Sequence, residues 1–166
     1  MITFILLMFF AIRLYTLYIS IQHERVLKTE GAKQYGVKNS KYLAITHTLI
    51  YVSAIITAII EHPKFDFISL VGLILLVFSY IVLFMVIRTL GSIWTLKIYI
   101  LKQHRIIDQG IFKYVKHPNY FLNIIPELIG VVLLTHAFTT ALLFIPYALF
   151  LYIRIQQEEQ AMAHLY

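Results

Sequence analysis

Three groups of polar side chains in this sequence border or interrupt long apolar stretches. The first is a segment with turn character that ends in His117, Pro118 and Tyr120, directly before an apolar run. Pro118 disfavours helical geometry at His117 and can itself occupy the first position of the next helix. Backbone and side-chain hydrogen-bonding groups therefore gather where that helix begins, although a single histidine in such a place is usually an ordinary interfacial residue.

The second group is the acid Glu127, which follows Pro126 inside the same apolar run. A carboxylate at membrane depth is costly and rarely faces lipid, so Glu127 is a candidate functional residue. A basic residue, Arg13, lies within the first apolar stretch of the chain. Two interpretations stay open: Glu127 takes part in a reaction, or it is protonated or paired with Arg13 and holds the helices together.

The third group lies at the end of the last apolar stretch, where Arg154 precedes the adjacent acids Glu158 and Glu159. If the helix continues, Arg154 and Glu158 are i,i+4 neighbours and can pair on a solvated helix end. The same residues also suit a polar, cationic ligand. Carboxylates accept hydrogen bonds from ribose hydroxyls and balance an ammonium or sulfonium charge.

The composition shows which elements must position these groups. Of the 166 residues, 60% belong to the hydrophobic set and only 13% are charged, and the mean hydropathy is +0.80. A soluble domain carries roughly 25% charged residues and cannot bury this much apolar surface in one core. The excess must face lipid, which predicts an all-α integral membrane protein. The chain has no cysteine, which excludes disulfides and thiolate zinc sites, and no metal site is expected.

Five membrane-spanning helices are expected, since one crossing needs about 20 apolar residues. The run from Phe121 to Ile153 would be about 50 Å long as one helix, so it is divided into two short helices. The stretch at the N-terminus lacks a positive n-region and a small-residue cleavage site, which favours a first helix over a signal peptide. The expected spans, in a single domain of residues 1–166 with a C-terminal helical tail, are 1–21, 43–60, 67–87, 120–135 and 138–154.

The positions of the basic residues indicate an orientation. Of the 14 lysines and arginines, five lie in segment 22–42 and six, Arg105 among them, in segment 88–118. A five-span chain places both segments on one side of the membrane, and the positive-inside rule makes that side cytoplasmic. The N-terminus is then outside, and the C-terminal tail lies in the cytoplasm. The net charge of +6 thus reflects topology, and no nucleic-acid partner is expected.

The connector 88–118 mixes apolar and basic residues and is expected to lie on the membrane interface, with Trp94 and Tyr99 among the lipid headgroups. Leu96, Ile98 and Ile100 have the spacing of a strand, so the choice between helix and strand stays open. The connector is either an interfacial anchor or a wall of a site that opens to the cytoplasm.

Taken together, these residues resemble the isoprenylcysteine carboxyl methyltransferase family, which is related to the membrane phospholipid methyltransferases. The carrying residues follow the family's order: Arg88–Gly91 with Trp94, the run Gly110–Tyr120, Glu127, and Arg154–Glu159. The N-terminal loop Glu24–Gly36 also looks like that of bacterial members. Two positions depart from the family pattern, because Leu122 replaces a usual glycine and Lys116 replaces the commoner arginine.

The resemblance implies S-adenosyl-L-methionine as methyl donor and a lipophilic acceptor, which is prenylcysteine-like or a small isoprenoid or polyketide lipid. It implies methylation of a carboxyl or acidic hydroxyl at the cytoplasmic face of the cell membrane. By the same resemblance, Arg154 orients the acceptor oxygen, and Glu127 acts as a base or supports the site. The implied cofactor-binding residues are Val115, Lys116, His117 and Tyr120 for the adenosyl part, and Glu158 and Glu159 for the ribose or amino-acid part.

Two other functions stay open. A membrane reductase of the sterol-reductase type would share a similar C-terminal region but use NADPH, and the short chain with few spans argues against it. A non-enzymatic membrane scaffold would not require His117, Glu158 or Glu159. The sequence does not indicate an oligomeric state.

Overall fold

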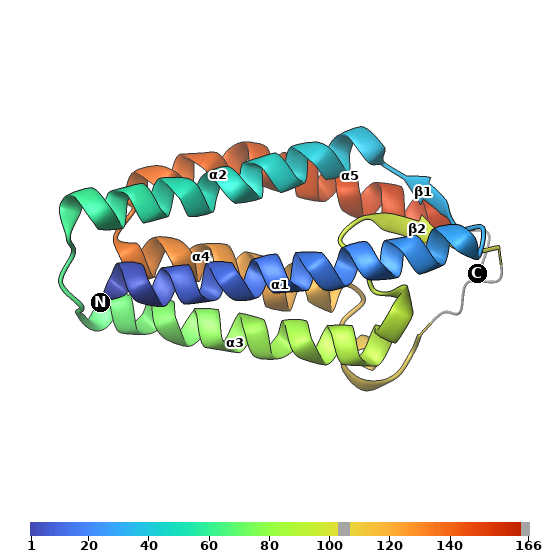
Figure 1. The fold of residues 1–166 in the computed structure, drawn as a ribbon, viewed down its shortest axis with the longest axis horizontal. Helices are drawn as coiled ribbons and strands as arrows, with labels where there is room; N and C mark the ends of the chain where they lie inside the picture. The colour runs from blue at the N-terminus through green and yellow to red at the C-terminus, as the bar shows by residue number, and fades with distance from the viewer. Residues whose placement is uncertain (103–106, 164–166) are drawn as a thin grey trace.

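Helices dominate the structure, a computed structural model that describes residues 1–102 and 107–163 (Figure 1). Within these residues a two-stranded sheet of β1 and β2 completes the regular structure. Short 3₁₀ turns precede or follow the longer elements, and a π-helical segment spans Asn119–Ile124. The main elements are α1 (Ile2–Thr29), β1 (Lys33–Tyr35), α2 (Val37–Glu61), α3 (Phe67–Leu90), β2 (Ile98–Ile100), α4 (Ile125–Thr135) and α5 (Phe144–Met162).

The helices have the lengths and compositions of membrane spans. Among the described residues, four helical segments are long and apolar enough to cross a bilayer: Ile2–Thr29, Val37–Glu61, Phe67–Ile93 and Phe138–Met162. The helix Asn119–Thr135 is also apolar but shorter. The chain is therefore a multi-pass, all-α integral membrane protein, as the sequence predicts. The expected C-terminal helical tail is also confirmed, because α5 continues beyond the long apolar stretch that ends at Ile153 and reaches Met162.

The two ends of the bundle carry different connections (Figure 1). The N-terminus, the α2–α3 connection and the turn between α4 and α5 lie at one end. The sheet and the last turns of α5 lie at the other end. Segments 22–42 and 88–118 thus meet at the end that carries the sheet, although Arg105 lies outside the described residues.

Two glycines let α3 and α4 approach closely. A Cβ atom on Gly72 would lie 2.3 Å from the backbone nitrogen of Leu134, and one on Gly130 would lie 2.8 Å from the carbonyl oxygen of Gly72. Small residues are typical of helix contacts in membranes, where close backbone packing replaces the hydrophobic driving force. This contact fixes α4, and with it the preceding His117–Tyr120 segment, against α3.

At the end opposite the sheet, Asp66 caps α3. Its Oδ1 atom accepts hydrogen bonds from the backbone N–H of Ser69 at 2.9 Å and from His136 Nε2 at 3.1 Å. The bond from Ser69 outweighs desolvation and, with the nearby His136, holds the pKa of Asp66 below its ordinary value. The α2–α3 connection is thereby tied to the turn between α4 and α5.

The connector after α3 forms a strand, β2, at Ile98–Ile100, where the sequence spacing was compatible with either a helix or a strand. Strand β2 pairs antiparallel with β1, so that Ile100 lies opposite Lys33 and Ile98 opposite Tyr35. Trp94 and Tyr99 are both buried, so their side chains contact protein and not the lipid headgroups. The ring of Trp94 packs edge-on against the His23 ring, and the Tyr99 hydroxyl donates to Gln34 at 2.9 Å. The connector therefore folds inward because α1 and β1 provide partners for its aromatic residues.

Candidate functional site

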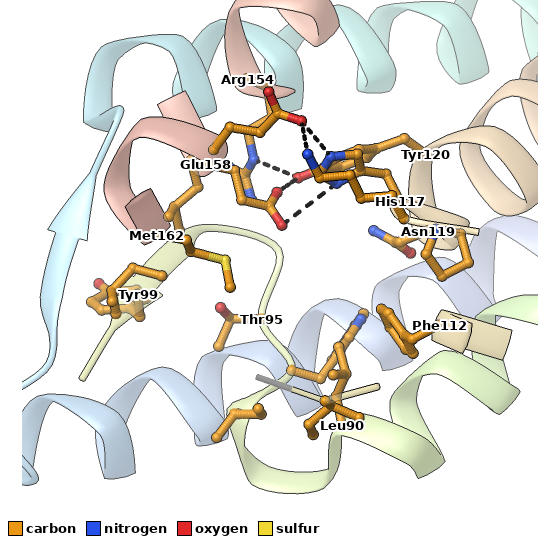
Figure 2. A pocket seen from close by; sticks show the side chains of 18 of the residues that line it. Leu90, Thr95, Tyr99, Phe112, His117, Asn119, Tyr120, Arg154, Glu158 and Met162 are labelled. Carbon is orange, nitrogen blue, oxygen red and sulfur yellow. Dashed lines mark hydrogen bonds and ion pairs between the residues drawn. The ribbon is translucent and has the colours of Figure 1, made fainter. Parts of the chain in front are cut away.

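A cavity of about 430 Å³ lies at the end of the bundle that carries the sheet (Figure 2). This volume is within the usual range for small-molecule sites. Leu90, Ile93 and Phe112 contribute apolar surface to its wall. Much of the polar wall comes from the start of the π-helical segment, from the residues just before it and from α5, and includes His117, Asn119, Tyr120, Arg154, Glu158 and Glu159. Lys116 and the connector residues Thr95 and Lys97 also line the cavity.

Arg154 is buried in this wall and donates to three separate segments. Its Nε donates to the hydroxyl of Tyr120 at 3.1 Å. Its Nη1 donates to Ser40 Oγ on α2 at 2.8 Å, and its Nη2 donates to the carbonyl of Leu96 at 2.9 Å. The rigid, planar fork of guanidinium donors suits such a three-way contact. The plane of the guanidinium in the cavity wall is thereby fixed.

The acids on α5 meet the residues that precede α4. The Tyr120 hydroxyl donates to Glu158 Oε2. Glu159 Oε1 lies 3.2 Å from His117 Nε2 and 2.7 Å from Lys116 Nζ. The side chains of Glu158 and Glu159 keep 27% and 37% of their surface exposed. Both carboxylates are therefore held in place and still accessible to a ligand in the cavity.

The local backbone explains how these side chains reach the cavity. Pro118 has a helical φ of −63° and immediately precedes the π-helical segment Asn119–Ile124. The carbonyl of His117 accepts hydrogen bonds from the N–H groups of Tyr120 and Phe121, at 3.1 and 3.2 Å. The rings of His117 and Tyr120 are stacked, with centroids 5.7 Å apart. Single π-helical turns of this kind are frequent at functional sites, because they redirect side chains within a helix.

Most of the residues that the sequence nominated for a cofactor gather here. Lys116, His117, Tyr120, Glu158 and Glu159 line the cavity, together with Arg154. Val115 is not among the residues that line it, and its backbone N–H donates to the carbonyl of Ile111 at 3.1 Å. Leu122 packs against the hydrophobic core instead of the cavity.

Other cavity residues were missed from the sequence. Asn119 lies inside the His117–Tyr120 motif and could have been nominated from its position alone. Lys97 and Tyr99 have the sequence pattern of interfacial residues, and they line the cavity because the connector folds inward. Ser40, which contacts Arg154 behind the cavity wall, could not be identified from the sequence, because the two positions are 114 residues apart.

Glu127 lies in a different cluster, formed by side chains from α1, α2, α3 and α4. Its side chain is fully buried, with Oε2 2.9 Å from Arg13 Nη2. Its Oε1 accepts hydrogen bonds from Tyr51 at 2.6 Å and Tyr80 at 3.1 Å, and lies 3.6 Å from His47 Nε2. The pairing of Arg13 with Glu127 that the sequence left open is thus present, and Glu127 is not among the residues that line the cavity. In the described ranges, 1–102 and 107–163, no group of three or more potential metal ligands occurs.

Comparisons with known proteins point to one family. The model of the isoprenylcysteine carboxyl methyltransferase (ICMT) family matches residues 70–164. An uncharacterized protein of Haemophilus influenzae is 53% identical over 157 residues, which cover 94% of this chain and 91% of that protein. Uncharacterized protein YpbQ of Bacillus subtilis is 30% identical over 144 residues, which cover 85% and 84%. No solved structure matches the chain.

Proposed function

The chain belongs to the isoprenylcysteine carboxyl methyltransferase family of membrane methyltransferases, and we propose that it uses S-adenosyl-L-methionine to O-methylate a lipophilic acceptor. The methylated group is a carboxyl or an acidic hydroxyl of a prenylcysteine-like, isoprenoid or polyketide lipid. The observation that carries this proposal is the composition of the cavity, in which Arg154 and Glu158 share a wall with Leu90 and Phe112. A charged cofactor and an apolar acceptor can therefore meet in one site, and residues 1–166 act as one domain.

The polar side chains of the cavity fit the chemistry of S-adenosylmethionine. Its ribose hydroxyls and its ammonium need acceptors, which the partly exposed carboxylates of Glu158 and Glu159 provide. The adenosyl part would lie along the segment from Val115 to Tyr120, where the rings of His117 and Tyr120 stack. When bound, the cofactor supplies an electrophilic methyl group on a sulfonium.

In this proposal Arg154 orients the acceptor oxygen. A carboxylate is already ionised at pH 7, so it needs a positioned counter-charge and not a base. Three of the five guanidinium N–H groups donate to Tyr120, Ser40 and Leu96, which leaves the others to donate to an acceptor oxygen. Displacement at a sulfonium depends on alignment and on exclusion of water, and the apolar wall at Leu90 and Phe112 favours both.

Glu127 has a role that depends on the acceptor. An enol or phenol must lose a proton, and Glu127, which is fully buried and does not line the cavity, would act as its base only if the acceptor reached the neighbouring cluster. A carboxyl acceptor makes no such demand. In that case Glu127 supports the site from the neighbouring cluster, where it pairs with Arg13.

Binding of S-adenosylmethionine to the purified protein tests the proposal directly. Calorimetry is expected to show binding, and Glu158→Gln is expected to weaken it about tenfold because a charge-assisted hydrogen bond is lost. The matched control is Glu61→Gln, an exposed acid that ends α2 and does not line the cavity, which should bind like the wild type. Absence of binding by the wild type would refute the cofactor assignment. Transfer of a labelled methyl group into a lipid extract then identifies the acceptor class.

We also propose that the protein lies in the cell membrane with the cavity facing the cytoplasm and the N-terminus outside. The positive-inside rule supports this orientation, since segments 22–42 and 88–118 carry most of the basic residues. A cytoplasmic cavity would also give the water-soluble cofactor direct access.

Single cysteines test the orientation cleanly, because the chain has no cysteine of its own. Lys64→Cys lies between α2 and α3, and Lys38→Cys lies at the start of α2; both positions are exposed. A membrane-impermeant maleimide added to intact cells is expected to label Lys64→Cys, and to label Lys38→Cys only after permeabilisation. The reverse pattern would overturn the orientation.

A further inference from the structure

Three polar side chains on α1 face the connector that forms part of the cavity wall. Ser20, His23 and Glu24 are spaced i, i+3 and i+4, so they share one face of the helix. Ser20 is 0% exposed and Glu24 is 4% exposed. We call these three residues the α1 clamp. They lie outside residues 70–164, the part of the chain that the family match covers.

Ser20 and Glu24 contact Leu96 and Lys97. The backbone N–H of Leu96 donates to Ser20 Oγ at 2.9 Å, and the Ser20 hydroxyl donates to Glu24 Oε1 at 3.3 Å. The other oxygen of Glu24, Oε2, accepts from Lys97 Nζ at 2.7 Å. A buried carboxylate is costly unless it is paired and hydrogen-bonded. Glu24 therefore favours the position of the connector in which Lys97 reaches its carboxylate.

His23 holds the beginning of the same segment. Its Nδ1 donates to the carbonyl of Trp94 at 2.8 Å, since a carbonyl oxygen can only accept. The two rings meet edge to face with centroids 6.4 Å apart. The α1 clamp thus contacts the segment Trp94–Lys97 at Trp94, Leu96 and Lys97.

Leu96 joins the α1 clamp to Arg154. Its N–H donates to Ser20, and its carbonyl accepts from Arg154 Nη2 at 2.9 Å. Loss of the Ser20 contact would therefore displace Leu96 and with it the carbonyl that Arg154 contacts. Among the three hydrogen-bond partners of Arg154 described above, this carbonyl is the one that lies in the segment Trp94–Lys97, which is neither helix nor strand.

We propose that Ser20, His23 and Glu24 are positioning residues, which fix the segment Trp94–Lys97 and, through the Leu96 carbonyl, set the guanidinium of Arg154 in the cavity. The inference rests on the proposed function for the role of Arg154 in methyl transfer. Its geometric part concerns the connector alone and is testable without any substrate.

Trp94 is the only tryptophan of the chain, and it lies within the held segment. Its fluorescence therefore reports the state of the connector. Ser20→Ala is expected to raise quenching of Trp94 by acrylamide roughly twofold, because loss of a buried hydrogen bond favours local opening. Ser20→Thr keeps the hydroxyl and should quench like the wild type. Thr16→Val is the matched control: Thr16 is equally buried on α1, but its hydroxyl donates within the helix, to the carbonyl of Arg13 at 2.9 Å.

The combined effect of substitutions at Ser20 and Arg154 distinguishes a positioning role of Ser20 from a general effect on stability. With an acceptor identified, Ser20→Ala is expected to lower kcat roughly tenfold, since small misplacements of a reacting group are costly. Thr16→Val should leave kcat unchanged, and Ser20→Thr should restore it. In an Arg154→Lys background, Ser20→Ala should have little further effect on kcat or on Trp94 quenching, because Ser20→Ala frees the N–H of Leu96 and Arg154→Lys frees its carbonyl, so both substitutions release the same residue.

The two proposals fail in different ways. If Ser20→Ala quenches like Thr16→Val, or if its effects multiply fully with those of Arg154→Lys, the positioning role is overturned whatever the activity. If the quenching pattern and its coupling to Arg154 hold but the wild type transfers no methyl group, the connector geometry stands and the proposed reaction is overturned.

Discussion

Arg13→Leu is expected to lower the free energy of unfolding by about 3–5 kcal/mol, because it leaves the buried carboxylate of Glu127 without its counter-charge. The two side chains lie 2.9 Å apart, and Glu127 has no exposed surface. Tyr51 and Tyr80 would still donate to the carboxylate, but neutral donors do not balance its charge. Reversible unfolding in mixed micelles, followed by circular dichroism, measures the loss.

Arg25→Leu provides the control, since Arg25 lies exposed on the same helix, and a surface substitution usually changes stability by less than about 0.5 kcal/mol. The double variant Arg13→Leu/Glu127→Leu is expected to regain most of the lost stability, because apolar residues often replace a buried ion pair without loss. If Arg13→Leu and Arg25→Leu unfold alike, the pair does not stabilise the bundle.

The same double variant separates the two roles of Glu127. A stable double variant that turns over like the wild type assigns Glu127 to structure alone. A stable double variant without turnover implicates the carboxylate in the reaction. For a carboxyl acceptor we expect the first result, because no base is needed.

Arg154→Lys is expected to lower kcat on the order of 10²-fold, a loss typical of removing one preorganised donor from an active site. A lysine ammonium has no planar fork, so it cannot donate to Tyr120, Ser40 and Leu96 in the arrangement that Arg154 adopts. The acceptor oxygen would then meet a charge that is no longer fixed. Initial rates with labelled cofactor and a saturating acceptor measure the effect.

Cofactor affinity should change much less in Arg154→Lys than kcat does, because Glu158 and Glu159 remain in place. Arg25→Lys makes the same chemical change at an exposed site and should behave like the wild type. An Arg154→Lys variant with normal kcat would show that Arg154 does not orient the acceptor.

Much of the fold could be predicted because membrane helices obey local rules. Each span must satisfy its own backbone hydrogen bonds in lipid, so apolar length alone locates it. The His117–Tyr120 motif and the Arg154–Glu159 run could also be nominated, because each is a short, continuous segment. The burial of Trp94 and Tyr99 could not be predicted, for the opposite reason: it depends on His23 and Gln34, which are distant in sequence.

The sequence by itself determined the all-α membrane class, the grouping of the basic residues in two segments, and a set of candidate site residues most of which line the cavity. These features depend on composition and on neighbours along the chain. Only the tertiary structure decided that Arg154 bonds Ser40 and Leu96, that Glu127 pairs with Arg13 outside the cavity, and that Ser20 accepts the Leu96 N–H. Each of these contacts joins helices or connectors far apart in sequence. A polar side chain buried in the bundle must find a partner, but which partner it finds depends on how the helices pack.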